Sequence, residues 1–326
     1  MMEIQNQLIK LLTTLLIIGF ALSTPVLLLA VMLSKIGECF KYKSPKSIIG
    51  EVAVVTGAAH GLGRAIALEL AGIGCHVAVV DIDINGAKET VEKIHQISRV
   101  KAKAYKVNVT SFTEITDLNA KVTRDLGMVT ILINNAGILL LRNRLDPAPE
   151  DVQRMIDVNL TSHFWTKTVF LPTMKRLRKG NIVTISSAAS LLPFAYHTTY
   201  TATKFGATGH MKALQLELAV EKQHDIHVTT VMPMILDTND EMSDLANISK
   251  MNQLYPLIKG QTAARRIVKG MLAGEREIKI PLILDILYRI LNLLPLSWQE
   301  RLILISASNK FLSYKEISLN AKIPKQ

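Results

Sequence analysis

Apolar runs alternate with amphipathic stretches through the middle of the chain. Six runs rich in valine, isoleucine and alanine have the pattern of buried β-strands, and they occupy residues 51–57, 75–81, 101–107, 129–134, 181–187 and 226–233. Stretches with apolar residues at helical spacing lie between them, and the clearest cover residues 64–70, 151–171 and 199–220. Strands that alternate with helices predict an α/β fold with a doubly wound parallel sheet, the Rossmann fold.

The amino-terminal region is strongly apolar. Residues 11–34 contain no charged side chain, and as a helix they would be about 36 Å long, enough for the ~30 Å hydrocarbon core of a bilayer. They can therefore cross a membrane once or form a hairpin bent at Pro25. A cleaved signal peptide is the alternative, but the apolar run continues through residues 27–33, which a cleaved signal should not do. Because more lysines follow this segment than precede it, the rest of the chain is expected on the cytosolic side.

The carboxyl-terminal region holds a second apolar stretch, residues 278–298. Lys279, Asp285 and Arg289 interrupt it and argue against a second membrane span. We therefore expect an interfacial helix or an apolar wall at a substrate entrance, with a subunit interface as the alternative. The predicted organisation is an amino-terminal membrane helix and linker (residues 1–44), one catalytic domain (45–275) and an apolar or amphipathic extension (276–326).

Composition narrows the classes of partner. The net charge is +11, but lysine and arginine are scattered and aromatic residues make up 5% of the chain, which argues against nucleic-acid binding. Cys39 and Cys75 are the only cysteines. Two cysteines make neither a disulfide framework nor a metal motif, so no metal site is expected and a reducing compartment is favoured. Cys39, just after the apolar segment, is an ordinary thiol or an acylation site.

A glycine-rich turn joins the first predicted strand to the first predicted helix. Thr56 and Gly57 end the strand, and Gly61 and Gly63 open the helix. Glycines in this context let backbone approach the pyrophosphate of a dinucleotide, which then lies at the helix amino terminus. The second strand ends in Asp81, which can accept both ribose hydroxyls of NAD and would repel the 2′-phosphate of NADP. A merely solvated carboxylate is the alternative reading of Asp81.

Candidate acid–base chemistry lies between the fifth strand and the following helix. Tyr200 and Lys204 are four residues apart, so a helix places both on one face. A phenol with a pKa of about 10 is a poor base at neutral pH, and a neighbouring ammonium is expected to lower that pKa. Ser187, at the end of the fifth strand, can hold a substrate oxygen together with Tyr200. Such a tyrosine could exchange a proton as a general acid and base.

Together with the Asn134-Asn135-Ala136-Gly137 motif, these stretches resemble the short-chain dehydrogenase/reductase family of the classical type over residues 49–275. The apolar flanks resemble the membrane-associated branch that contains the 17-beta-hydroxysteroid dehydrogenase 11 type and the epidermal retinol dehydrogenases. The resemblance implies a catalytic set of Asn159, Ser187, Tyr200 and Lys204, with Ser187 also binding substrate and Asn159 holding a relay water near Lys204.

The resemblance also implies the cofactor contacts, which are Thr56, Gly57, His60, Gly61, Leu62, Gly63, Asp81, Asn108, Val109, Asn135, Ala136, Gly137, Tyr200, Lys204, Pro233 and Thr238. Two positions depart from the family pattern. Asn108 replaces an aspartate found in many members, and Met234 replaces the glycine that usually follows Pro233. Residues 240–260 correspond to a mobile substrate lid, and the apolar residues 139–141 either line a pocket or simply pack.

The resulting expectation is an oxidoreductase that interconverts a lipophilic alcohol (a retinoid, steroid or long-chain alcohol) and its carbonyl. NAD is the expected cofactor and NADP is disfavoured. The alternatives are an NADPH-linked carbonyl reductase and a non-enzymatic surface protein that keeps the fold. Membrane lipid is an expected partner and a homodimer is left open. The expected location is the endoplasmic reticulum membrane or a lipid droplet, with the catalytic domain facing the cytosol.

Overall fold

The computed structural model describes residues 19, 47–140, 147–194, 197–238 and 257–302. The chain divides into two units, Met1–Pro45 and Lys46–Gln326, and all described residues except Gly19 belong to the second. The predicted membrane segment, residues 11–34, therefore falls almost entirely outside the described part. Among the described residues no helix has both the length and the hydropathy needed to cross a membrane.

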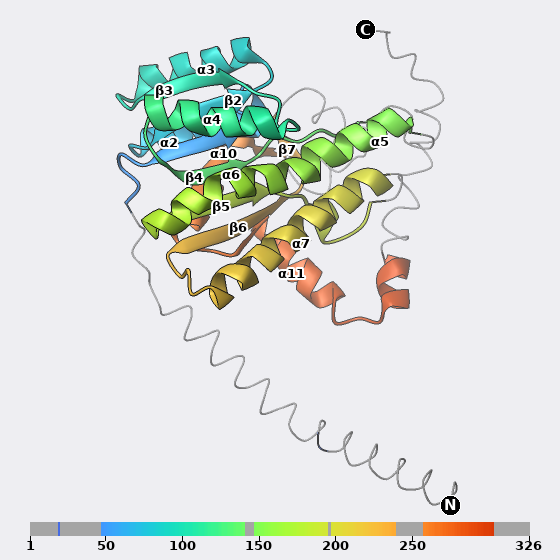
Figure 1. Cartoon of the computed structure of the whole chain (residues 1–326). Coiled ribbons are helices and arrows are strands. Elements are labelled where there is room, and N and C mark those ends of the chain that lie inside the picture. Colours follow the sequence, from blue (N-terminus) through green and yellow to red (C-terminus); the bar gives the residue numbers. More distant parts are fainter. Residues whose placement is uncertain (1–18, 20–46, 141–146, 195–196, 239–256, 303–326) are drawn as a thin grey trace, which may run out of the picture. The chain divides into compact units, whose positions relative to one another are not determined.

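A seven-stranded parallel sheet forms the centre of the second unit (Figure 1). The strands stand in the order β3-β2-β1-β4-β5-β6-β9. Their bounds are β1 Val52–Thr56, β2 His76–Asp81, β3 Ala102–Lys106, β4 Val129–Asn134, β5 Gly180–Ile185, β6 Ile226–Pro233 and β9 Glu277–Ile280. The order reverses between β1 and β4, and ligands of such sheets bind outside the carboxyl ends of the strands at this switch point. The predicted doubly wound parallel fold is confirmed.

Helices cover both faces of the sheet (Figure 1). One face carries α2 (Gly61–Gly72), α3 (Ile84–Ile97) and α10 (Gly260–Leu272), and the other carries α4 (Phe112–Asp125), α6 (Ser162–Leu177) and α7 (Thr198–Val220). Successive residues of β1 supply the two cores in turn, because side chains alternate across a strand. Ala53 and Val55 pack in the first core, and Val52 and Val54 pack in the second.

The sheet extends beyond the predicted end of the catalytic domain at residue 275. In β9, Ile278 pairs with Val231 of β6 and belongs to the core. The helix expected within residues 278–298 is therefore shorter than predicted and begins at α11 (Leu282–Leu291). The isoleucines of this short strand and the apolar helix that follows Pro281 read as one run in the sequence, because short runs do not reveal which structure they form.

Two further segments differ from the sequence prediction. The expected helix over residues 151–171 consists of α5 (Pro149–Ile156), a π-helical turn η1 (Asp157–Thr161) and α6. Residues 240–256, which make up most of the expected substrate lid (240–260), lie outside the described residues. The last part of the lid forms β8 (Ile258–Lys259), which pairs with β7 (Leu236–Asp237) before α10 begins at Gly260.

Candidate active site

The glycine turn between β1 and α2 leaves no room for side chains. Gly57 and Gly61 have φ angles of 64° and 54°, in the left-handed region that favours glycine. A Cβ on Gly63 would lie 2.0 Å from the Gly57 carbonyl oxygen, and one on Gly57 would lie 2.8 Å from Ala136 Cα. The turn therefore brings bare backbone to the switch point of the sheet.

The residues that follow β4 fasten this turn. The side-chain amide of Asn135 donates to the carbonyl oxygens of Thr56 and Gly57, both at 2.9 Å. The backbone amides of Asn135 and Ala136 donate to Thr56 Oγ1 at 3.0 and 3.1 Å. Thr56 and Asn135, both expected to contact the cofactor, thus belong to one hydrogen-bonded unit that joins the ends of β1 and β4.

The amino terminus of α2 fits a pyrophosphate. His60 is the N-cap residue. In the described part of the chain, its side chain makes no capping hydrogen bond to this helix, and the first turn contains no acidic residue. Helix N–H groups in this state, together with the helix dipole, attract an anion. Thr238 lies against the same turn, since a Cβ on Gly61 would be 3.4 Å from Thr238 Cβ. The glycine turn and Thr238, far apart in sequence, therefore lie next to one another.

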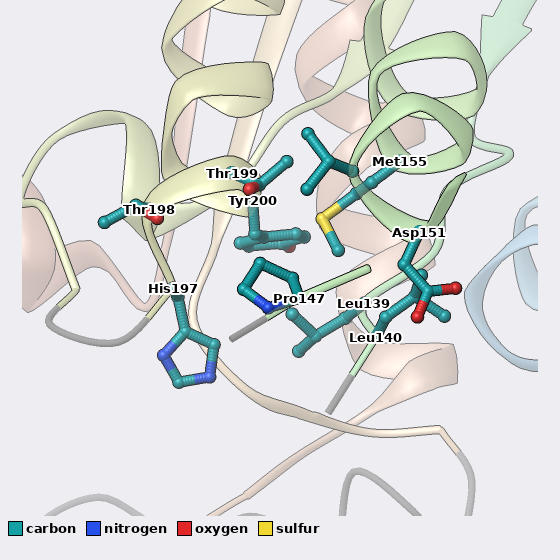
Figure 2. A pocket seen from close by; sticks show the side chains of 10 residues that line it. Leu139, Leu140, Pro147, Asp151, Met155, His197, Thr198, Thr199 and Tyr200 are labelled. Atoms are coloured by element: carbon teal, nitrogen blue, oxygen red, sulfur yellow. The ribbon is translucent and has the colours of Figure 1, made fainter. Parts of the chain in front are cut away.

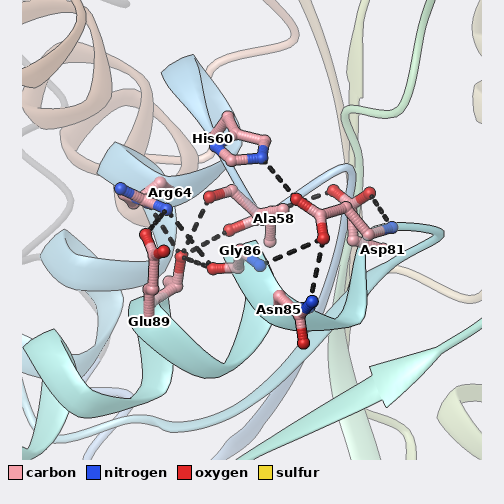
Figure 3. A network of polar contacts seen from close by, with 10 residues as sticks. Ala58, His60, Arg64, Asp81, Asn85, Gly86 and Glu89 are labelled. Atoms are coloured by element: carbon pink, nitrogen blue, oxygen red, sulfur yellow. Dashed lines mark hydrogen bonds and ion pairs between the residues drawn. The ribbon is translucent and has the colours of Figure 1, made fainter.

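Carboxylates gather where the adenosine ribose of a dinucleotide would lie (Figure 3). Asp81 Oδ2 accepts from the Ala59 amide at 2.9 Å, and its Oδ1 accepts from the Asp83 amide at 3.0 Å. His60 Nε2 lies 2.7 Å from Asp83 Oδ2, and this hydrogen bond holds the pKa of the Asp83 carboxyl below its usual range. The site therefore presents negative charge to the ribose.

Arg64 is the cation nearest in sequence to this site, but its guanidinium is engaged with α3 (Figure 3). It donates to Thr90 Oγ1 at 2.9 Å and to the Gly86 carbonyl at 3.3 Å, and it pairs with Glu89 at 3.1 Å. A 2′-phosphate would have to break these contacts to recruit Arg64.

Asn108 and Val109 follow β3 at the same carboxyl edge of the sheet. Asn108 Oδ1 accepts from the backbone amide and the hydroxyl of Thr110, at 3.1 and 2.9 Å. The backbone amide of Asn108 donates to the Glu114 carboxylate at 2.8 Å. The side-chain oxygen of Asn108 thus stabilises its own turn, which fixes the position of the residue. Val109 is buried.

Tyr200 and Lys204 lie on the first turns of α7, as the spacing predicts. Lys204 Nζ is 5.6 Å from the centre of the Tyr200 ring and donates to the Ile185 carbonyl at 3.0 Å. A hydrogen bond joins the side chains of Tyr200 and Ser187, and Ser187 Oγ also accepts from the Ala189 amide at 3.1 Å. The end of β5 and the start of α7 therefore bring Ser187, Tyr200 and Lys204 together.

The expected lowering of the Tyr200 pKa by Lys204 is not what the structure shows. Burial raises the pKa of Tyr200, and the hydrogen bond from Ser187 opposes that effect only in part. Burial also lowers the pKa of Lys204 to about 8. The physical reason is that both groups leave water, and desolvation disfavours the charged form of each. The helical spacing predicts proximity correctly, but it does not include this cost of burial.

Asn159 joins the site through the π-helical turn. Its side chain accepts from the Ile138 amide and donates to the Ile138 carbonyl, both at 2.8 Å, and it donates to Thr203 Oγ1 at 3.3 Å. A Cβ on Gly137 would lie 3.4 Å from Asn159 Oδ1 and 3.5 Å from Lys204 Nζ. Gly137 therefore lies within van der Waals reach of both Asn159 and Lys204. Single π turns often mark functional sites.

An apolar pocket adjoins the Tyr200 ring (Figure 2). Leu139 and Leu140 line it, so two of the three residues 139–141 border a pocket, and Leu141 lies outside the described residues. The sequence motifs do not indicate the other lining side chains, which include Pro147, Asp151, Val152, Met155 and His197. The only indication of these lining residues in the sequence is the helical spacing of residues 151 and 155, which places both on one face of a helix.

Pro233 and Met234 lie at the carboxyl end of β6. Pro233 is the last residue of β6, and the Met234 amide donates to the Ile280 carbonyl at 2.8 Å. Met234 packs with Ala188, Leu191 and Leu284 in a small apolar cluster. The methionine in place of the usual glycine is therefore accommodated by packing against the region that follows Ser187.

Comparisons with known proteins give the same assignment. The family model for the short chain dehydrogenase matches residues 51–248. Estradiol 17-beta-dehydrogenase 11 of Homo sapiens is 30% identical over 82% of this chain and 87% of its own length. Epidermal retinol dehydrogenase 2 of Homo sapiens is 31% identical over 78% of this chain and 81% of its own length.

A solved structure agrees in fold. A 7α-hydroxysteroid dehydrogenase in complex with NADH and 7-oxo glycochenodeoxycholic acid is 27% identical, with a TM-score of 0.66 over 72% of this chain and 93% of that one. The glycine turn, the fold and these matches together identify an NAD(P)-dependent oxidoreductase that acts on CH–OH groups. The chain belongs to the classical short-chain dehydrogenase/reductase family.

Proposed function

We propose that the chain is a membrane-attached, NAD(H)-preferring dehydrogenase of a lipophilic alcohol such as a retinoid, a steroid or a long-chain alcohol. The observation that carries this proposal is the Ser187–Tyr200 hydrogen bond beside a pocket lined by Leu139, Leu140 and Met155. Polar groups that bind an alcohol oxygen are thereby combined with walls that favour an apolar substrate. The names of the estradiol and retinol dehydrogenases that resemble this chain support the same substrate class.

The site residues divide the work of alcohol oxidation. Ser187 and Tyr200 hold the substrate hydroxyl, and Tyr200 in its phenolate form accepts the hydroxyl proton as the C–H bond breaks. NAD, when bound, supplies the acceptor for the hydride. Lys204 provides positive charge beneath Tyr200, and Asn159 orders the segment around Ile138 and Thr203 and connects Lys204 to solvent through water. In the reverse direction Tyr200 donates the proton to the carbonyl oxygen.

NAD preference rests on two features of the ribose site. Asp81 is held in place by two backbone amides, and Arg64 is engaged by Thr90, Gly86 and Glu89. A carboxylate facing the 2′-position disfavours a phosphate there. An NADPH-linked carbonyl reductase is the alternative, and it would need Arg64 to leave α3.

The uncharged residues 11–34 support attachment to the endoplasmic reticulum membrane or a lipid droplet, with the catalytic domain in the cytosol. A substrate screen tests the function. The purified full chain is incubated with NAD or NADP and with all-trans-retinol, estradiol or a long-chain primary alcohol, and reduced cofactor is followed by fluorescence. Turnover of at least one lipophilic alcohol with NAD is expected. Cofactor binding without turnover of any of them would favour the non-enzymatic alternative.

A further inference from the structure

Exposed apolar side chains concentrate at the carboxyl-terminal end of the described chain. Nine of the nineteen large apolar side chains that are exposed in the described part lie within residues 282–302. Five of them form a continuous stripe on α11, namely Leu282, Ile283, Ile286, Leu287 and Ile290. Leu293, Leu296, Trp298 and Leu302 continue it. Soluble monomers rarely expose a contiguous apolar surface of this kind without using it.

The opposite face of α11 is fixed to the catalytic domain. Leu284 is buried against Ala188, Leu191 and Met232, and Tyr288 packs beside it. Asp285 pairs with Lys279 of β9 at 2.7 Å and with Arg289 at 2.9 Å. Because packing and ion pairs hold this face, the apolar stripe on the other face must point away from the domain (α11 in Figure 1).

We propose that α11 and the residues up to 302 form a lipid-binding surface that lies in the plane of the membrane interface. The tether is the first reason for choosing lipid as the occupant. Only residues 35–46 separate the uncharged segment from the described domain, and twelve residues reach at most about 40 Å when fully extended. A domain held this close meets the lipid surface at high effective concentration, so even a weak contact is formed.

The character of the stripe is the second reason. Its members are aliphatic residues and one tryptophan, and they follow the helix surface at positions 282, 283, 286, 287 and 290. A lipid surface accepts such side chains without a complementary shape, and tryptophan favours the boundary between hydrocarbon and headgroups. Ionic side chains lie beneath the stripe at Asp285 and Arg289, where they pair with each other.

This surface has a consequence for substrate entry, which rests on the proposed function. Leu284 and Tyr288 pack on Ala188 and Leu191, which lie one and four residues after Ser187. The lipid-facing helix is therefore one layer of side chains away from the substrate side of the site. A lipophilic alcohol dissolved in the membrane would reach Ser187 and Tyr200 from this face.

Tryptophan fluorescence tests the surface in the full chain. Trp165 and Trp298 are the only tryptophans, so Trp165→Phe leaves Trp298 as the single reporter. The chain is reconstituted in phosphatidylcholine liposomes with plain or brominated acyl chains. Brominated lipid should reduce Trp298 emission at least about twofold, because an interfacial helix places its side chains against the acyl chains.

Two double variants in the Trp165→Phe background make the test specific. Ile286→Gln with Ile290→Gln should abolish most of the quenching. Leu216→Gln with Val220→Gln, which changes two apolar residues on α7 that are more exposed than Ile286 and Ile290, should leave it unchanged. Circular dichroism checks that all variants keep the fold.

Flotation of the same liposomes separates the possible failures. If the chains float but Trp298 emits equally strongly in plain and in brominated lipid, this inference alone is overturned. Chains that do not float overturn both this inference and the proposed membrane attachment, whereas the substrate screen remains an independent test of the chemistry. In detergent, acrylamide quenching of Trp298 is measured at several protein concentrations. If the protection of Trp298 increases with protein concentration, the stripe contacts a second copy of the chain, and the inference is overturned.

Discussion

At the scale of single residues, the site combines a tyrosine and a lysine whose charged forms are both disfavoured by burial. The pKa of Tyr200 is raised and that of Lys204 is lowered to about 8. Ser187 partly offsets the first effect through its hydrogen bond, and the Ile185 carbonyl accepts from Lys204. Burying such a pair costs stability, which is consistent with the acid–base role proposed for Tyr200.

Replacing Tyr200 with phenylalanine tests the acid–base assignment. The change removes only the hydroxyl, so kcat should fall by about 10²–10⁴-fold. The dissociation constant of NADH, measured by fluorescence, should stay within about threefold because the ring remains.

Tyr105→Phe is the matched control, since the hydroxyl of Tyr105 bonds Asp125 at 3.1 Å in a different part of the fold. It should leave kcat close to that of the wild type. If Tyr200→Phe keeps more than a tenth of the wild-type kcat, Tyr200 is not the acid–base.

Lys204→Met should change how stability depends on pH. The folded pKa of Lys204, about 8, lies below the unfolded value of 10.5, so unfolding takes up a proton between these two values. The destabilisation caused by burying charged Lys204 is fully present below the folded pKa, and it disappears as pH rises toward the unfolded pKa. Relative to the variant, the wild type should gain on the order of 2 kcal/mol in unfolding free energy from about pH 7.5 to about pH 9.5.

Urea unfolding of both proteins without cofactor measures this difference. Comparing the two chains cancels the other groups that titrate in this window, such as Cys75, whose pKa burial raises to about 12. Parallel stability curves across the window would show that Lys204 carries no such penalty.

Asp81→Asn should relax the choice of cofactor. The amide keeps an oxygen for the Ala59 amide but removes the negative charge from the ribose site. The ratio of the dissociation constants for NADPH and NADH should fall about tenfold or more, since like charges in contact cost several kcal/mol. Asp117→Asn, an exposed change on α4, is the control. An unchanged ratio in Asp81→Asn would remove the basis for NAD preference.

At the scale of elements, the turn into α2 depends on a close approach of backbone that one methyl group would prevent. Gly63→Ala would place its Cβ 2.0 Å from the Gly57 carbonyl oxygen. We expect a loss of about 3 kcal/mol or more in unfolding free energy, together with weaker NADH binding. Thermal unfolding and cofactor titration measure the two effects.

Gly72→Ala at the other end of α2 is the matched control. Nothing in the described structure lies within 4 Å of its added Cβ. Alanine is the better helix former, so this variant should be neutral or more stable by up to about 1 kcal/mol. Equal behaviour of the two variants would show that the turn has room to relax.

At the scale of the whole molecule, the distribution of apolar and basic residues predicts how the chain meets a membrane. Residues 11–34 are uncharged and are followed by Lys35, Lys41, Lys43 and Lys46. The full chain should remain in the membrane pellet after a carbonate wash. In sealed microsomes, added protease should digest the catalytic domain, because basic residues stay on the cytosolic side. Protection until detergent is added would place the domain in the lumen.

Local patterns in the sequence determined much of the fold. The six apolar runs correspond to β1 to β6, and the strand–glycine–helix pattern predicted the turn at Gly57 to Gly63. The spacing of Tyr200 and Lys204 also predicted their shared position on α7. These features depend on backbone periodicity and on residues close in sequence, which a single chain displays directly.

Tertiary structure alone decided the rest. The short strand β9 forms because β6 offers it a partner, and Asn159 reaches Ile138 and Thr203 because a π turn interrupts the expected helix. Burial reversed the expected direction of the Tyr200 pKa, and packing on Ala188 and Leu191 turned the stripe of α11 outward. Each of these depends on which distant segments exclude water from one another, and hydrophobic spacing along one segment carries no information about that exclusion.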